Sequence, residues 1–112
     1  MRYYKQQLVF SASDLVTFVG CRHATVLDRR QLDAPVPVAE DDEYLKLLQE
    51  KGLEHERNLR DRLSAEGRHV LEIAQEGTLE DRTARTRQAM VAGADVIYQG
   101  AFFSGRWHGY AD

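Results

Sequence analysis

The longest helical pattern in this chain, from Asp42 to Glu66, constrains the fold more than any other feature. Its leucines recur three or four residues apart, which is the spacing of side chains on one face of an α-helix. The leucines of this stripe are Leu45, Leu48, Leu59 and Leu63. Acidic residues precede the pattern and Gly67 follows it, as is typical of the two ends of a helix. The pattern therefore predicts one long helix with an apolar face turned inward.

Three residues on this predicted inward face are unusual for a buried surface. At about 100° per residue, Gly52, His55 and Glu56 fall on the same side as the leucines. A buried ionisable group without a partner costs several kcal/mol, so we expect a metal, a substrate or a hydrogen-bonding neighbour there. Because glycine within a helix costs about 1 kcal/mol relative to alanine, Gly52 suggests close approach by another segment. Spacing alone leaves the ligand and structural interpretations equally open.

The remaining patterns predict further helices and several strands. Ser13 is expected to cap a helical segment that fades by Asp33, and Thr78 to cap a third helix, Leu79–Ala92. Strand-like segments are Tyr3–Phe10, His69–Ile73, Ala94–Phe103 and Arg106–Asp112, with a hairpin turn at Ser104–Gly105. We therefore expect an α/β (α+β) fold, in which N-terminal helices precede a partial mixed sheet with helices packed on it. Residues 1–112 are expected to form a single domain.

Composition excludes several functional classes. Hydrophobic residues make up 43% of the chain and charged residues 29%, which is typical of a soluble globular protein. The net charge of −3 gives no bulk attraction to nucleic acid or to an anionic membrane. No apolar run approaches the ~20 residues of a membrane span, so we expect a cytoplasmic protein without a membrane partner. The clustered Arg82, Arg85 and Arg87 are expected to be mostly solvated.

The inventory of residues that could carry chemistry is short. The sequence has no glycine-rich phosphate loop, no paired-cysteine zinc pattern and no serine nucleophile elbow. What remains is His55 and Glu56 on a helix and Asp112 on a later strand, a set that suits Mg²⁺ or Mn²⁺ and phosphodiester hydrolysis. His108 would lie about 13 Å from Asp112 along that strand, so we expect His108 to be a surface or packing residue.

Three motifs of this chain together resemble a known family. In sequence order they are Ser11-x-Ser13-x-Leu15-x-x-Phe18-x-x-Cys21, Gly52-x-x-His55-Glu56 and Gly109-Tyr110-Ala111-Asp112. Their order and spacing resemble the opening of RecB-like nucleases of the PD-(D/E)XK superfamily. The resemblance is closest to a bacterial branch of RecB-family nucleases, some of which are fused to a helicase. It implies an incomplete restriction-endonuclease-like core, with DNA and a helicase domain of the same parent chain as partners.

The resemblance also implies which residues bind cofactors. In the family, a strand aspartate and a helical residue bind the metal, which implies Asp112 with His55 or Glu56. The commoner pattern places three residues between the glycine and a histidine; here that position holds Glu56, so both residues remain candidates. Iron–sulfur members carry one cysteine near the first helix, which implies Cys21 as a ligand of a [4Fe–4S] cluster in the full-length parent. A buried structural cysteine is the favoured alternative.

The family's next motif, a strand Glu-x-Lys, does not occur in this sequence, nor does its later glutamine-tyrosine motif. We therefore expect the N-terminal part of a metal-dependent DNA nuclease, truncated after Asp112 and inactive by itself. One alternative is a non-catalytic nucleic-acid-binding or interaction module with a degenerate nuclease fold, which the acidic balance favours. Another is a structural α+β domain in which His55 and Glu56 belong to a buried polar network.

Overall fold

The computed structural model describes residues 1–40 and 42–111, which form an α+β fold, as expected from the sequence. Four helices and three two-stranded sheets lie within these residues. In chain order the elements are β1 (Arg2–Tyr4), β2 (Gln7–Val9), α1 (Ala12–Gly20), α2 (Arg22–Asp33), α3 (Glu43–Ala65), β3 (Val70–Glu72), α4 (Leu79–Val91), β4 (Val96–Tyr98), β5 (Gly100–Ser104) and β6 (Trp107–Ala111).

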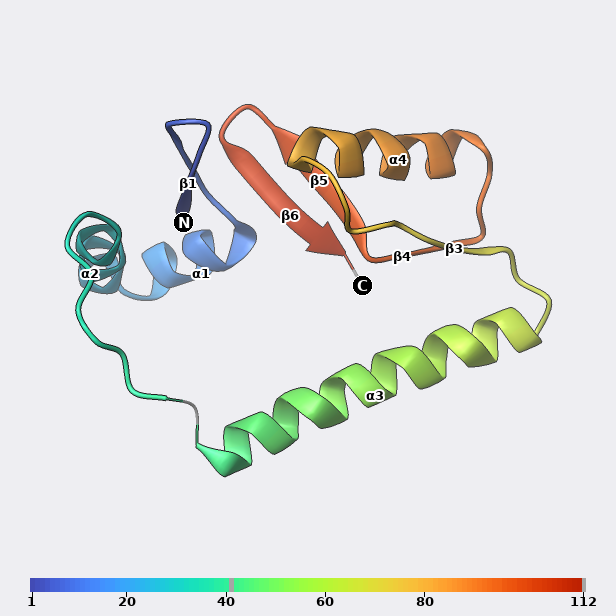
Figure 1. Ribbon diagram of the computed structural model, residues 1–112, viewed down its shortest axis with the longest axis horizontal. Helices are drawn as coiled ribbons and strands as arrows, with labels where there is room; N and C mark the ends of the chain where they lie inside the picture. The colour runs from blue at the N-terminus through green and yellow to red at the C-terminus, as the bar shows by residue number, and fades with distance from the viewer. Residues whose placement is uncertain (41, 112) are drawn as a thin grey trace.

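The sheets are of mixed orientation and lie around α4 (Figure 1). Strands β1 and β2 form one antiparallel hairpin, and β5 and β6 form another. Strands β3 and β4 pair in parallel, and α4 is the connection between them. A parallel bridge from Phe10 to Trp107 joins the N-terminal hairpin to β6. The N-terminal hairpin therefore lies beside the start of β6, while α3 runs along the opposite side of the molecule.

The core is small and lies where α4 packs against β4 and β5. Its buried residues are Val9, Ile73, Leu79, Thr86, Ala89, Tyr98 and Ala101. Helix α4 approaches β5 closely at Gly100, where an added Cβ atom would lie 3.4 Å from Thr86 Cγ2. A Cβ atom alone would be in ordinary contact there, but Gly100 is buried, so a side chain larger than alanine would crowd the helix.

The first helical segment differs from the expectation at both its cap and its continuity. The N-cap is Ser11 rather than Ser13, because Asp14 lies three residues after Ser11 and completes a capping box. Asp14 Oδ2 accepts the Ser11 N–H at 2.6 Å, and Ser11 Oγ accepts the Asp14 N–H at 3.3 Å. Cys21 has extended backbone angles, φ −155° and ψ 101°, and divides the segment into α1 and α2. Asp33 is the last residue of α2, as expected.

The ends of α3 and α4 agree with the predictions. Asp42 caps α3 by accepting the Leu45 N–H at 2.7 Å, and Gly67 follows the helix with φ +84°. Thr78 caps α4 through a capping box with Asp81, and Gly93 follows with φ +78°. Such left-handed backbone favours glycine, which explains why both helices end where they do.

Three positions in the strands depart from the expectation because of turn conformation. Tyr3–Phe10 forms a hairpin, since Lys5 and Gln6 adopt positive φ values of 47° and 64°. Gln99 has φ 60° and divides the predicted strand Ala94–Phe103 into β4 and β5. The final turn is Gly105–Arg106 rather than Ser104–Gly105, because Ser104 still pairs with Trp107.

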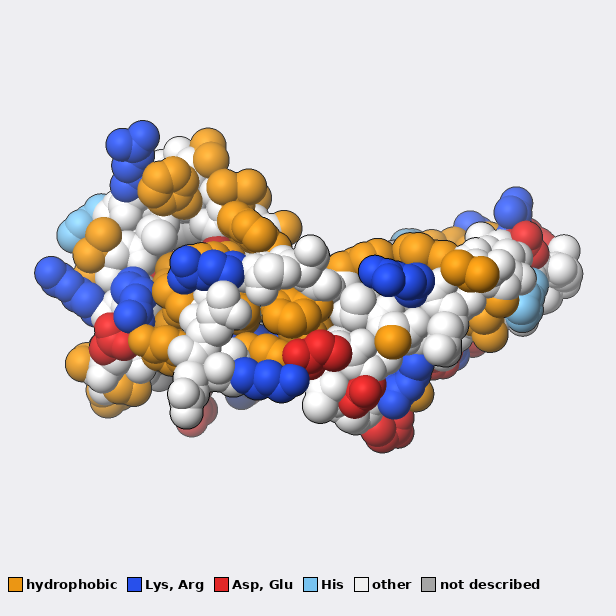
Figure 2. Space-filling view, turned by 90° about the horizontal axis from the view of Figure 1, so that it is seen from above, with side chains coloured by type: hydrophobic (Ala, Val, Ile, Leu, Met, Phe, Trp, Pro, Cys, Tyr) orange, Lys and Arg blue, Asp and Glu red, His pale blue; other side chains and the backbone are white. Residues whose placement is uncertain are grey.

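Helix α3 stands apart from the core and buries none of its residues. The radius of gyration is 17.0 Å, against about 13 Å for a compact domain of this length. Hydrophobic side chains are accordingly spread over much of the surface, with Lys and Arg side chains interspersed (Figure 2). Within residues 1–40 and 42–111, no helix is long and apolar enough to cross a membrane.

Candidate functional site

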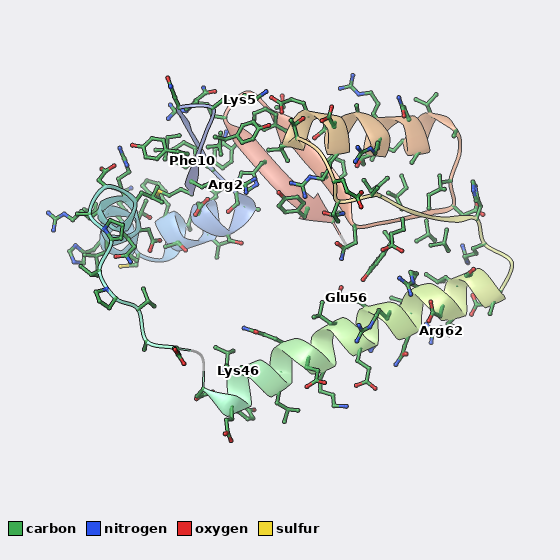
Figure 3. All side chains as sticks on the ribbon, viewed as in Figure 1. Arg2, Lys5, Phe10, Lys46, Glu56 and Arg62 are labelled. Atoms are coloured by element: carbon green, nitrogen blue, oxygen red, sulfur yellow. The ribbon has the colours of Figure 1, made fainter. Side chains whose placement is uncertain are left out.

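Of the two helical candidates, Glu56 is the one that faces the strands. Its side chain points from α3 toward the sheet side of the molecule (Figure 3). The Tyr98 hydroxyl of β4 donates a hydrogen bond to Glu56 Oε2 at 3.4 Å. Glu56 forms no ion pair within 4.0 Å to any other residue that the structure describes. Its carboxylate therefore retains lone pairs that a cation could use.

The face of α3 that meets the strands is rotated from the predicted leucine stripe. Glu56, Arg60 and Leu63 are half-buried, which confirms the inward position predicted for Glu56 and Leu63. Leu48 and Leu59 are 50% and 39% exposed, so their predicted inward position was wrong. Arg60 Nη1 lies 3.3 Å from Glu72 Oε2 of β3, and its guanidinium lies 5.3 Å from the centre of the Tyr98 ring. These contacts orient the helix, and sequence periodicity contains no information about them.

His55 lies about 100° around the helix from Glu56 and does not face the strands. Its side chain is exposed and lies beside Asn58, Leu59 and Arg62 of the same helix. Gly52 also differs from the expectation, because no other described segment comes within 4 Å of the position of an added Cβ. The close approach inferred at Gly52 was therefore wrong.

Asp112, the third predicted ligand, lies outside the described residues. The residue before it in the sequence, Ala111, pairs with Gly100 at the end of the β5–β6 hairpin. Gly100 follows Tyr98 by two residues, and Tyr98 is the hydrogen-bond donor to Glu56. Within the described ranges, no three His, Cys, Asp or Glu side chains are grouped closely enough to hold a metal. Tyr98 thus contacts Glu56 and lies two residues before Gly100, which pairs with the last residue of β6.

Cys21 is a free, exposed thiol. The favoured expectation of a buried structural cysteine was therefore wrong, because Cys21 lies in the extended break between α1 and α2 rather than on a packed helix face. A role as a [4Fe–4S] ligand in a longer parent stays a prediction.

His108 on β6 is half-buried, which favours packing between the two expected roles of surface and packing residue. Its ring centre lies 5.9 Å from that of Tyr110 on the same strand face. Its Nδ1 atom is buried without a hydrogen-bond partner among the described residues. Burial lowers the pKa of His108, and the positive charge of Arg2 lowers it further. The imidazole is therefore held in its neutral form at neutral pH.

The structure contains a second polar cluster, in which two arginines contact the Tyr110 hydroxyl. The sequence did not indicate it. Arg2 Nη2 and Arg82 Nη2 lie 3.2 and 3.0 Å from the Tyr110 hydroxyl oxygen. Arg82 also donates to Gln75 Oε1 at 2.9 Å, and Arg85 donates to two backbone carbonyls, so these two are less solvated than expected. Arg87 is exposed, as expected. A local sequence pattern cannot predict the contact between Arg2 and Tyr110, because the two residues are 108 positions apart in the sequence.

Comparison with known proteins adds no family assignment: the chain matches no family model, and neither the curated proteins nor the solved structures give a significant match.

Proposed function

We propose that this chain contributes Glu56 of α3 and Asp112, after β6, to a divalent-metal site of a nuclease that hydrolyses phosphodiester bonds. One observation carries the proposal: Glu56, on a helix that buries none of its residues, turns toward β4 and accepts a hydrogen bond from Tyr98 at 3.4 Å. Tyr98 leads within two residues to Gly100, which pairs with the residue before Asp112. Glu56 and the strand that ends one residue before Asp112 thus belong to neighbouring parts of the fold.

The spacing along the helix also supports Glu56 over His55 as the helical ligand. Three residues separate Gly52 from Glu56, which is the separation in the commoner family pattern. Glu56 faces the strands, whereas His55 is exposed on another side of α3. The proposal therefore assigns the metal to two carboxylates, which are the ligands that Mg²⁺ and Mn²⁺ prefer.

The residues around Glu56 have positioning roles in this proposal. The Tyr98 hydroxyl donates to the carboxylate and limits its rotation. Arg60 links α3 to Glu72 of β3 and covers the Tyr98 ring, so it holds the helix at the strands. A divalent metal bound there would supply an activated water and neutralise charge on the phosphate. DNA cleavage by this chain alone is not expected, because the family's Glu-x-Lys motif does not occur in its sequence.

Mn²⁺ binding to the full chain tests this proposal, measured by electron paramagnetic resonance or calorimetry. We expect Glu56→Gln and Asp112→Asn each to weaken binding by about tenfold or more, since each removes a charged ligand. Glu54→Gln is the matched control, because Glu54 lies on the same helix but pairs with Lys51 at 2.7 Å. His55→Ala should behave like this control. If Glu56→Gln binds Mn²⁺ as wild type does, the assignment of Glu56 is wrong.

The second candidate function is a non-catalytic nucleic-acid-binding module, and the arginines at Tyr110 favour it. Arg2 and Arg82 are positively charged and form no ion pair with a described carboxylate, so they are available to a phosphate. This alternative predicts nucleic-acid binding that does not depend on a metal. A complete lack of Mn²⁺ binding would favour it, and would leave Glu56 as part of a structural network with Tyr98 and Arg60.

A further inference from the structure

Two guanidinium groups from distant parts of the chain converge on a single neutral oxygen. Arg2 lies on β1, Arg82 on α4 and Tyr110 on β6, and the two arginine Nη2 atoms lie 3.2 and 3.0 Å from the Tyr110 hydroxyl oxygen. Figure 3 shows Arg2 pointing from the N-terminal hairpin toward β6. Arg2 is exposed and Tyr110 is 46% exposed, so a ligand can reach the cluster from solvent.

The cluster has an excess of positive charge. Neither arginine lies within 4.0 Å of a carboxylate among the residues that the structure describes. Arg82 Nε is buried and has no acceptor in the described part of the chain. Two cations that share one neutral oxygen repel each other, and a charged N–H without an acceptor is costly. The arrangement therefore favours the binding of an anion.

Two acidic side chains, Asp14 and Glu80, pair with other cations. Asp14 pairs with the N-terminal ammonium group of Met1. Glu80 pairs with Lys5 at 2.7 Å, and its pKa falls to about 2 because Lys5 and then Tyr4 donate to it. His108, beside Tyr110, is kept neutral by burial and by Arg2. Among the residues that the structure describes, none of these groups forms an ion pair with Arg2 or Arg82.

We propose that Arg2, Arg82 and Tyr110 bind a phosphate group of a nucleic-acid backbone. Guanidinium groups present several N–H donors in a plane, which suits the oxygens of a phosphodiester. Tyr110 accepts from both arginines, so its own hydroxyl hydrogen remains free to donate to a phosphate oxygen. The choice of nucleic acid as the source of the phosphate rests on the proposed function, but binding at this cluster requires no metal.

The experiment measures binding of a fluorescent single-stranded oligonucleotide to the full chain by anisotropy, in buffer that contains EDTA. We expect Arg2→Gln and Arg82→Gln each to weaken binding by about tenfold, because each removes a charge-assisted contact. The slope of log affinity against log salt should fall by about 0.7 for each lost phosphate contact. Arg87→Gln is the control, since it removes the same charge from an exposed position of α4.

Two further comparisons separate this site from simpler explanations. An oligonucleotide with uncharged methylphosphonate linkages should bind wild type and Arg82→Gln alike. Arg2 is an exposed strand residue, so Arg2→Gln should fold normally even if Arg82→Gln is destabilised. If Arg2→Gln and Arg87→Gln have the same small effect, general charge explains binding and the site is wrong. A loss that persists with the methylphosphonate oligonucleotide would also overturn the assignment to the backbone.

The two proposals can fail separately. Arg2→Gln should leave Mn²⁺ affinity unchanged, and Glu56→Gln should leave oligonucleotide binding in EDTA unchanged. If wild type shows no measurable Mn²⁺ binding while its oligonucleotide binding still depends on Arg2, the nuclease proposal is wrong and this site is retained. If Mn²⁺ binding depends on Glu56 while oligonucleotide binding does not depend on Arg2, only this site is wrong.

Discussion

Helices α3 and α4 begin and end alike, yet they differ in how far they are buried. Both have a side-chain N-cap and a glycine with positive φ just beyond the C-terminus. Helix α4 buries Leu79, Thr86 and Ala89, whereas the longer α3 buries none of its residues. Capping is therefore a local property of the sequence, while burial depends on what each helix contacts. We expect most of the stability to come from α4 and its strands.

The largest expected effect comes from exchanging a leucine for alanine in each helix. Leu79 on α4 is 2% exposed and Leu53 on α3 is 51% exposed. Leu79→Ala should lower the free energy of unfolding by about 3 kcal/mol, because it leaves a cavity in the core. Leu53→Ala should lower it by less than about 1 kcal/mol. Urea denaturation followed by circular dichroism measures both, and equal losses would show that α3 is as well packed as α4.

Two threonines of α4 give the next largest contrast. Thr86 is 1% exposed and its hydroxyl oxygen accepts the Ala101 N–H at 2.9 Å. Thr86→Val should cost about 2 kcal/mol, because the buried N–H then has no acceptor. The Thr83 hydroxyl is buried without a partner among the described residues, so Thr83→Val should be neutral or stabilising. Denaturation midpoints of the two variants measure this difference, and a costly Thr83→Val would reveal a partner for that hydroxyl.

Removal of the N-caps should distinguish the helices in a different way. Thr78→Ala should lower the global free energy of unfolding by about 1 kcal/mol, because α4 unfolds with the core. Asp42→Ala removes an equivalent cap from α3, whose first turn is exposed, with Tyr44 68% exposed. That change should instead fray the start of α3 and reduce helix content without changing global unfolding. Hydrogen exchange of the backbone amides separates the two outcomes, and equal global losses would contradict the contrast.

The smallest expected effect is a pH dependence in the packed region. Burial and then Arg2 lower the pKa of His108 in the folded chain, whereas the unfolded imidazole titrates near its ordinary value of about 6.5. Below that pH the unfolded state binds a proton that the folded state does not, so stability falls as pH drops from about 7 to 5. His108→Gln should reduce this slope in denaturation experiments at several pH values. An unchanged slope would show that His108 does not contribute to it.

The sequence alone predicted the α+β class and the ends of α3 and α4. These depend on local chemistry: a capping side chain three residues from its N–H, or a glycine where φ is positive. The cap at Ser11 was also available locally, because Asp14 lies three residues later. Spacing and residue chemistry supplied His55, Glu56 and Asp112 as candidates. The resemblance to RecB-like nucleases implied Asp112 as a metal ligand and left the choice between His55 and Glu56 open.

Only the tertiary structure decided which side of α3 meets the strands. A leucine stripe shows that a helix has an apolar side, but the contacts of Glu56 and Arg60 with β3 and β4 fixed its orientation. The convergence of Arg2 and Arg82 on Tyr110 likewise depends on the packing of three elements from distant parts of the chain. Local spacing predicts conformation because backbone hydrogen bonds join near neighbours. It cannot predict these sites, because their partners are brought together only by folding.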